Sequence, residues 1–249
     1  MNDIPIDVFI DLPPSPEPVQ AGRLWSHFRK GRESASFEYN REWLANPYRF
    51  ALEPLLPLAD GTFHTTPGQS VFGAIGDSTP DRWGRILMRR AELARARAAN
   101  ESPRTLSELD YLLRVNDEAR QGALRFSQDG GQSFCAPPGA TPIPPLVNLS
   151  RLLHAADHFC RDDENAEDLR LLLAPGSSLG GARPKASVKD KKGNLCIAKF
   201  PRHDDEYNVV AWEAVALTLA SKAGLQVPRF ELEKITDKDV LIVWRFDRT

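Results

Sequence analysis

The sequence has few of the features that place a protein in a membrane or in an oxidising compartment. Only three of its 249 residues are cysteines, Cys135, Cys160 and Cys196, and no two of them form a CxxC pair. This spacing disfavours a disulfide framework or a zinc site and favours a reducing cytosol. The sequence has no run of about 18 apolar residues, and its N-terminus has acids and prolines where a signal peptide needs a basic start and an apolar core. We therefore expect a cytoplasmic protein that does not enter a membrane.

The chain also lacks an excess of charge of one sign. It has 32 Lys and Arg against 34 Asp and Glu, a formal net charge of -2, so global charge gives no attraction to nucleic acid. Six arginines lie on a helix predicted over 81–99, without interleaved aromatic residues on the same face. We interpret them as a solvated helix face and expect no direct nucleic-acid binding. The preceding Ser78 or Thr79 is expected to cap this helix, with Pro80 at its first position.

Proline and glycine are concentrated in one stretch, DGGQSFCAPPGATPIPP, which predicts a linker. We expect an N-terminal domain over residues 1–130, the linker over 131–145, and a C-terminal domain over 146–249. The N-terminal domain is predicted to contain short strands at 4–10, 24–28 and 35–39, a helix capped by Thr105 and Glu108, and a strand GALRF.

The C-terminal domain shows a different order of elements. The patterns predict two helices over 146–161 and 165–173, a hairpin over 184–200 and a helix over about 206–223. Gly224 is the expected C′ glycine of that last helix, and strands near 229–235 and 240–246 complete the chain. The predicted fold class is α+β.

Two common ligand sites are excluded by missing residues. Gly176 and Gly181 have the GxxxxG spacing of a Walker loop, but Ala182-Arg183 stand where that loop needs Lys and then Ser or Thr. His154 and His158 lie four residues apart on a predicted helix, but no third metal ligand is evident. We expect neither a Walker-type loop nor a metal site.

The phosphate site of a protein kinase, in contrast, has its parts in order. It needs a small-residue loop over the phosphates, a strand lysine, and a helix glutamate that holds the lysine. The sequence provides SSLGGARPK, then Lys199 at the end of CIAKF, then Glu213 in WEAVALTLA. A charge at the end of an apolar strand needs a partner, so these two residues are predicted to form an ion pair. From spacing alone the pair could be purely structural, and Lys199 could equally face solvent.

Several further motifs accompany this arrangement. They are FEYNREWL, ALEPLLPL, DSTPDRWGR and LLRVNDEARQGALRF in the first part of the chain, and SSLGGARPKA, IAKFP, LASKAGLQVP and RFDR in the second. In this order they resemble the HipA family of serine/threonine kinase toxins from bacterial toxin–antitoxin modules, over essentially the whole chain. The resemblance implies a HipA N-terminal subdomain followed by a protein-kinase-like N-lobe, an antiparallel sheet with helices.

The resemblance also implies a role for each matching residue. Ser178 matches the serine that these kinases phosphorylate on themselves, Lys199 matches the lysine that contacts ATP, and Glu213 would pair with it. The other expected ATP contacts are Gly180, Gly181, Ala182, Arg183, Pro184 and Lys185 in the phosphate loop, and Trp244, Arg245 and Phe246 in the hinge that receives adenine. A phosphate on Ser178 would add roughly two negative charges beside this loop and repel ATP.

The catalytic residues of a kinase are not expected in this chain. In the family that it resembles, the catalytic aspartate and the metal-binding asparagine and aspartate follow the RFDR strand, in the C-terminal lobe. We expect the first half of a HipA-like kinase, a truncated gene product or one part of a split protein. Alone it would bind ATP weakly or not at all and would transfer no phosphate, and Mg²⁺ is expected only in an intact kinase. Possible partners are a HipB-like helix-turn-helix antitoxin and a separately encoded C-terminal lobe. The alternative is a non-catalytic module that binds an antitoxin-like or C-terminal-lobe partner.

Overall fold

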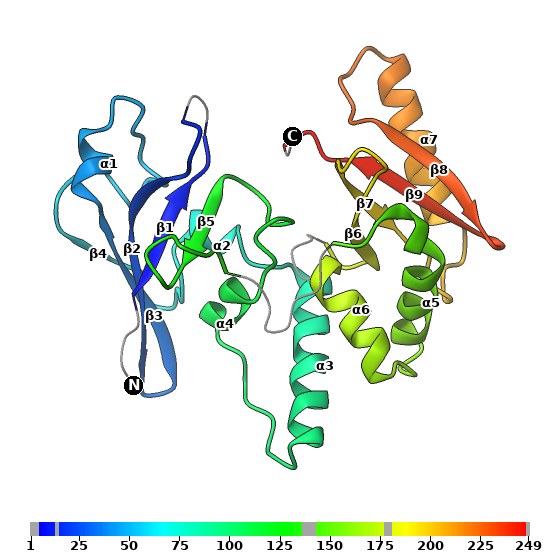
Figure 1. Ribbon diagram of the computed structural model, residues 1–249, viewed down its shortest axis with the longest axis horizontal. Helices are drawn as coiled ribbons and strands as arrows, with labels where there is room; N and C mark the ends of the chain where they lie inside the picture. Colours follow the sequence, from blue (N-terminus) through cyan, green and yellow to red (C-terminus); the bar gives the residue numbers. More distant parts are fainter. Residues whose placement is uncertain (1–4, 13–14, 136–142, 177–180, 248–249) are drawn as a thin grey trace. The chain divides into compact units, whose positions relative to one another are not determined.

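Two compact units make up the protein in the computed structural model, which describes residues 5–12, 15–135, 143–176 and 181–247. The first unit comprises Met1–Pro80 and Thr105–Pro138, and the second comprises Asp81–Arg104 and Gly139–Thr249 (Figure 1). The segment 81–104 thus groups with the C-terminal part of the chain, although it lies within the predicted domain 1–130. The predicted limits 1–130, 131–145 and 146–249 themselves stay a prediction.

The first unit is built on a five-stranded antiparallel sheet with the strand order β4-β3-β2-β1-β5. The strands predicted from the sequence are present, and the second and third extend further than expected, because they form one long hairpin. Its turn is Lys30-Gly31, and both residues have positive φ, which suits a two-residue hairpin turn. The strands are β1 (Ile6–Ile10), β2 (Val19–Arg29), β3 (Arg32–Tyr39), β4 (Thr62–His64) and β5 (Leu124–Ser127).

Three short helices, α1 (Arg41–Ala45), α2 (Gly73–Gly76) and α4 (Glu108–Leu113), belong to this unit. The start of α4 differs from the prediction. Its N-cap is Ser107, which forms a capping box with Asp110, so Thr105 is not the cap. The physical reason is a tertiary contact, because the carboxylate of Glu33 on β3 accepts the backbone N–H groups of Glu108 and Leu109 at 2.8 and 3.1 Å.

A fully buried arginine holds the centre of the first unit together. The Arg120 guanidinium donates to the backbone carbonyl oxygens of Ser78, Leu112 and Val115 at 3.0–3.2 Å. It also lies 4.8 Å from the ring centroid of Phe126 on β5. One side chain therefore connects three parts of the unit, which are the segment after α2, the end of α4 and strand β5.

The second unit is built on a four-stranded antiparallel sheet with the order β6-β7-β9-β8. The predicted hairpin, helices and final strands are all present. Gly224 follows α7 with φ +82, as a C′ glycine does. The elements are β6 (Lys185–Lys189), β7 (Leu195–Lys199), β8 (Phe230–Ile235), β9 (Lys238–Trp244), α3 (Arg82–Ala98), a 3₁₀ turn (Leu146–Asn148), α5 (Leu149–Cys160), α6 (Ala166–Gly176) and α7 (Val209–Lys222).

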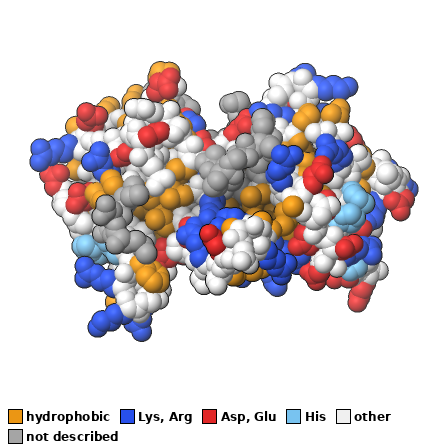
Figure 2. All heavy atoms as spheres, turned by 60° about the horizontal axis from the view of Figure 1, so that its bottom comes forward, with side chains coloured by type: hydrophobic (Ala, Val, Ile, Leu, Met, Phe, Trp, Pro, Cys, Tyr) orange, Lys and Arg blue, Asp and Glu red, His pale blue; other side chains and the backbone are white. Residues whose placement is uncertain are grey.

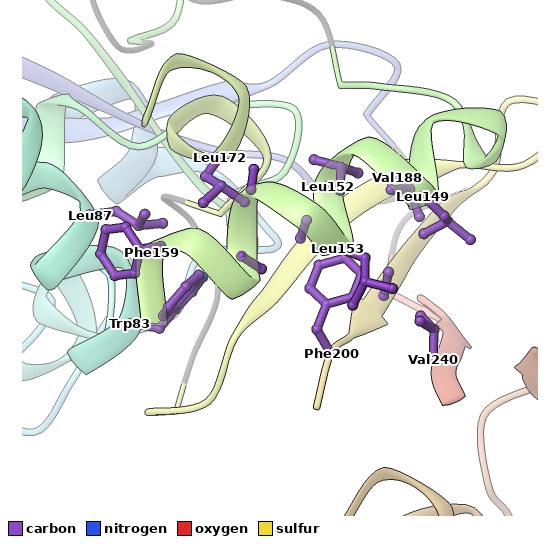
Figure 3. Packing of buried hydrophobic residues seen from close by; sticks show 14 of the residues in the cluster. Trp83, Leu87, Leu149, Leu152, Leu153, Phe159, Leu172, Val188, Phe200 and Val240 are labelled. Carbon is purple, nitrogen blue, oxygen red and sulfur yellow. The ribbon is translucent and has the colours of Figure 1, made fainter. Parts of the chain in front are cut away.

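The two faces of this sheet are covered differently, as the alternation of a strand requires. One face packs against α3, α5 and α6 in the large core of Figure 3, which includes Trp83, Leu172 and Val240. The other face meets α7 through a small cluster formed by Val210, Ala214 and Leu241. These findings give a mixed fold of helices and antiparallel sheets.

Helix α3 begins later than the sequence predicts. Its N-cap is Asp81 rather than Ser78 or Thr79, so Pro80 precedes the cap and is not the first helical residue. The arginines that follow take part in ion pairs more than the predicted solvated face suggests. Arg90 pairs with Glu164 at 2.7 Å and lies 4.2 Å from the ring centroid of Phe159.

Charged groups of both signs are mixed on the surface. On the face drawn in Figure 2, Lys and Arg side chains lie scattered among Asp and Glu side chains. Among the helices of the described ranges, none combines the length and hydropathy that a membrane span requires.

Candidate nucleotide-binding site

The β6–β7 hairpin brings two lysines face to face. Lys185 at the start of β6 is the register partner of Lys199 at the end of β7. Directly opposed residues of an antiparallel pair project from the same face of the sheet. Their neighbours Ala186 and Ala198 belong to the large core, so both lysines project from the other face, on which α7 lies.

Helix α7 supplies the predicted partner of one of these lysines. The Nζ atom of Lys199 forms an ion pair with Oε1 of Glu213, and both side chains remain partly exposed. The predicted contact is therefore present, while its role toward a nucleotide stays a prediction. In this arrangement the Glu213 carboxylate fixes the position of the Lys199 ammonium group. An ammonium group has three N–H donors, so it can donate to a further acceptor as well.

Lys185 lies under the end of the predicted phosphate loop. It is buried, and a Cβ atom added to Gly181 would lie 2.8 Å from its Nζ atom. Since Gly181 also has φ +78, a larger residue there would be strained and would displace the lysine. Burial, and next the positive charge of Lys199, lower the pKa of Lys185 to about 8.

Two residues at the start of α3, Asp81 and Trp83, hold this loop end in place. The Asp81 carboxylate accepts the backbone N–H of Gly181 at 2.7 Å. The backbone N–H of Trp83 donates to the Gly181 carbonyl oxygen at 3.0 Å, and its indole Nε1 donates to the Lys185 carbonyl oxygen at 2.9 Å. The contact between the motif STPDRWGR and this loop joins residues 100 positions apart in the sequence, so no local pattern predicts it.

The remaining loop residues are tied to the end of β7. The Pro184 carbonyl oxygen accepts the backbone N–H of Phe200 at 3.0 Å. Ala182 follows Gly181 in the sequence and precedes Arg183. Arg183 forms an ion pair with Asp205, whose carboxylate also accepts the backbone N–H of Arg202 at 2.9 Å. Gly180 and Ser178, the expected phosphorylation site, lie outside the described residues.

The residues predicted as an adenine hinge follow β9. The backbone N–H of Trp244 donates to Arg229 at 2.8 Å, and that of Arg245 donates to Leu195 at 2.9 Å. The Trp244 indole donates to Asp190 at 3.0 Å, which lowers the pKa of that carboxyl. Phe246 is 85% exposed. The backbone N–H groups of Trp244 and Arg245 therefore already donate to other backbone carbonyl oxygens. A contact between this segment and adenine stays a prediction.

The histidine pair on α5 lies apart from this arrangement. The rings of His154 and His158 have centroids 3.9 Å apart, and Nδ1 of His158 is 3.0 Å from the carboxylate of Asp168. In the parts of the chain that the structure describes, no group of three or more potential metal ligands comes together.

Comparison with known proteins identifies the segment that carries this arrangement. The sequence model of the HipA-like C-terminal domain family matches residues 177–249, which confirms the resemblance stated from the sequence for that segment. No curated protein matches the chain.

A solved structure is also similar to this chain. It is "Shewanella oneidensis MR-1 Toxin Antitoxin System HipA, HipB and its operator DNA complex", with 18% sequence identity and a TM-score of 0.48. The match covers 98% of this chain and 51% of the other, so this chain spans about half the length of that protein.

Proposed function

We propose that the second unit binds the phosphates of ATP as the nucleotide-binding part of a HipA-like serine/threonine kinase. The match of residues 177–249 to the HipA-like C-terminal domain family supports this proposal. The observation that carries this proposal is the opposed pair Lys185 and Lys199, with Gly181 at positive φ close to the Lys185 ammonium group. Two ammonium groups on one face of a hairpin attract a polyphosphate, and each can donate to its oxygens.

The electrostatics of the pair support an anionic ligand. Lys185 is buried near a second positive charge, an arrangement that disfavours its own ionisation and lowers its pKa. A phosphate group between the two lysines would reverse this effect, because it would offset both charges. Such a perturbed lysine is typical of functional sites.

The proposal does not include phosphate transfer by these 249 residues alone. The sequence contains one HxD tripeptide, His203-Asp204-Asp205. Its final carboxylate is engaged by Arg183 and by the backbone of Arg202, and it lies between Lys199 and α7. These contacts give that aspartate a structural role in the loop between Lys199 and α7.

Nucleotide binding is tested with a fluorescent ATP analogue, 2′/3′-N-methylanthraniloyl-ATP, followed by fluorescence anisotropy. We expect weak, saturable binding that Lys199→Met reduces by roughly tenfold or more, because a charge-assisted hydrogen bond is lost. The matched control is Lys192→Met in the exposed turn of the same hairpin, which should leave the affinity unchanged. Equal affinities of wild type and Lys199→Met would contradict the proposal.

Phosphate transfer is tested separately with radiolabelled ATP and Mg²⁺. We expect no label on the protein, and label on Ser178 would show that the chain is itself a kinase. Addition of a HipA-type C-terminal lobe tests whether transfer appears when the two parts are combined.

A second function, partner binding without chemistry, is favoured by the surface of α7. Trp212, Val215 and Leu219 lie three and four residues apart, so they share one face of the helix. Their exposed fractions are 62%, 42% and 60%, which is unusual for large apolar side chains on one stripe. Capture of a helix-turn-helix protein of HipB type by the wild type, but not by Trp212→Ser/Leu219→Ser, would support this function.

A further inference from the structure

The first unit contains a cavity of about 500 Å³ that the nucleotide proposal does not use. It lies between the β1–β2 connection and the segment that runs from α1 to Phe50. Its wall includes Ile10, Val19 and Trp43, and none of the described residues that line it is charged. This volume lies within the range of small-molecule sites, about 300–1,000 Å³.

One wall residue has an unmet hydrogen bond. Trp43 is 3% exposed, and its indole Nε1 has no hydrogen-bond partner among the residues that the structure describes. A buried N–H group without an acceptor destabilises the fold, whereas an apolar aromatic side chain such as phenylalanine carries no such cost. The indole therefore fits a ligand that brings an acceptor.

The mouth of the cavity is apolar as well. Leu12, Tyr48 and Phe50 all line it and are 37–66% exposed. The Phe50 ring also packs edge-on against Trp43, with centroids 5.5 Å apart. A shared apolar mouth around one hollow indicates ligand contact more than three isolated exposed side chains would.

We propose that this cavity binds a neutral, apolar small molecule with one hydrogen-bond acceptor, which takes the indole N–H of Trp43. A charged ligand is disfavoured because the described part of the wall offers no charged side chain to pair with it. The site lies in the first unit and makes no use of the lysine pair. A failure of the nucleotide-binding proposal would therefore not affect this one.

The experiment uses the full chain and the fluorescent ketone prodan, whose emission increases and shifts to the blue in an apolar site. Prodan is then displaced by two ligands of similar shape, acetophenone with a carbonyl acceptor and ethylbenzene without one. The decisive comparison is between wild type and Trp43→Phe for each ligand, because the double difference isolates the hydrogen bond.

We expect prodan to bind saturably at one site. Trp43→Phe should weaken the affinity for acetophenone by about threefold to tenfold and change the affinity for ethylbenzene by less than twofold. The control Trp25→Phe, at a half-buried position on β2 that does not line the cavity, should change the binding of neither ligand. Equal effects of Trp43→Phe on both ligands, or no saturable prodan binding, would overturn the proposal.

A second variant covers the case in which Trp43→Phe does not fold. Tyr48 is exposed at the mouth, so Tyr48→Ala should leave the fold intact, which circular dichroism verifies. It should weaken prodan and both competing ligands by at least about threefold, in line with the loss of one aromatic contact. Unchanged binding of all three by the folded Tyr48→Ala variant would refute the site.

Discussion

The affinity of the second unit for ATP should depend on pH through Lys185. Burial and the charge of Lys199 lower its pKa to about 8, so about nine-tenths of the molecules carry the charge at pH 7 and about one-tenth at pH 9. If only the ammonium form holds the phosphate, the affinity should fall about tenfold between these two values. The affinity should fall as the pH rises, because Lys185 loses its positive charge as the pH passes about 8.

Two measurements test this dependence. The first is the anisotropy titration with the fluorescent ATP analogue at several pH values, for the wild type and for Lys185→Met. The variant should bind weakly at every pH, below the level of the wild type at pH 9, where about one-tenth of the wild-type molecules still carry the charge. It also corrects for the titration of the nucleotide, because that contribution is the same for both proteins.

The second measurement is NMR of the lysine ¹³Cε resonances. Lys185 should titrate near pH 8 in the free protein, and saturating ATP should raise its pKa, because the added phosphates favour the ammonium form. A Lys185 resonance that titrates at the ordinary lysine value near 10.4, or one that ATP does not move, would refute the reasoning. So would an affinity with the same pH dependence in wild type and Lys185→Met.

Three further changes test the scaffold around the two candidate sites. Arg120→Met should destabilise the first unit by about 3 kcal/mol, because three buried carbonyl oxygens lose their donor; urea unfolding at a constant m-value measures this. Leu172→Ala should destabilise the second unit by about 3 kcal/mol through a cavity in its core, seen in the same assay, and a loss below about 1 kcal/mol would contradict the packing. Trp83→Phe should lower the stability by about 1 kcal/mol and also weaken ATP binding, since it removes the hydrogen bond from the indole to the Lys185 carbonyl oxygen. An unchanged ATP affinity would show that this hydrogen bond does not position the loop.

The elements of the second unit follow closely from local sequence patterns. The β6–β7 hairpin was predicted from alternating residues around a turn, and the end of α7 from Gly224. The ion pair between Lys199 and Glu213 was predicted from the cost of leaving a charge unpaired on an apolar strand. Each of these signals lies within a few residues of the structure that it specifies.

The errors occurred where a distant contact decides between local alternatives. Ser78, Thr79 and Asp81 all have side chains suited to capping a helix, and Thr105 and Ser107 offered a similar choice. At α4 the carboxylate of Glu33 binds the N–H groups of Glu108 and Leu109 and so fixes the start. No spacing rule within the helix contains that information.

Asp81 shows how such a contact changes the meaning of a motif. At the N-cap of α3 its carboxylate makes no capping hydrogen bond; it accepts the N–H of Gly181 instead. The first turn of α3 also contains Trp83, which bonds to both ends of the segment 181–185 and contributes to the core of the second unit. The candidate nucleotide site is therefore not contained in residues 139–249. A fragment of those residues alone would lose both the core contacts of α3 and the groups that hold the loop above Lys185, so its ATP affinity would report on a loop without its support.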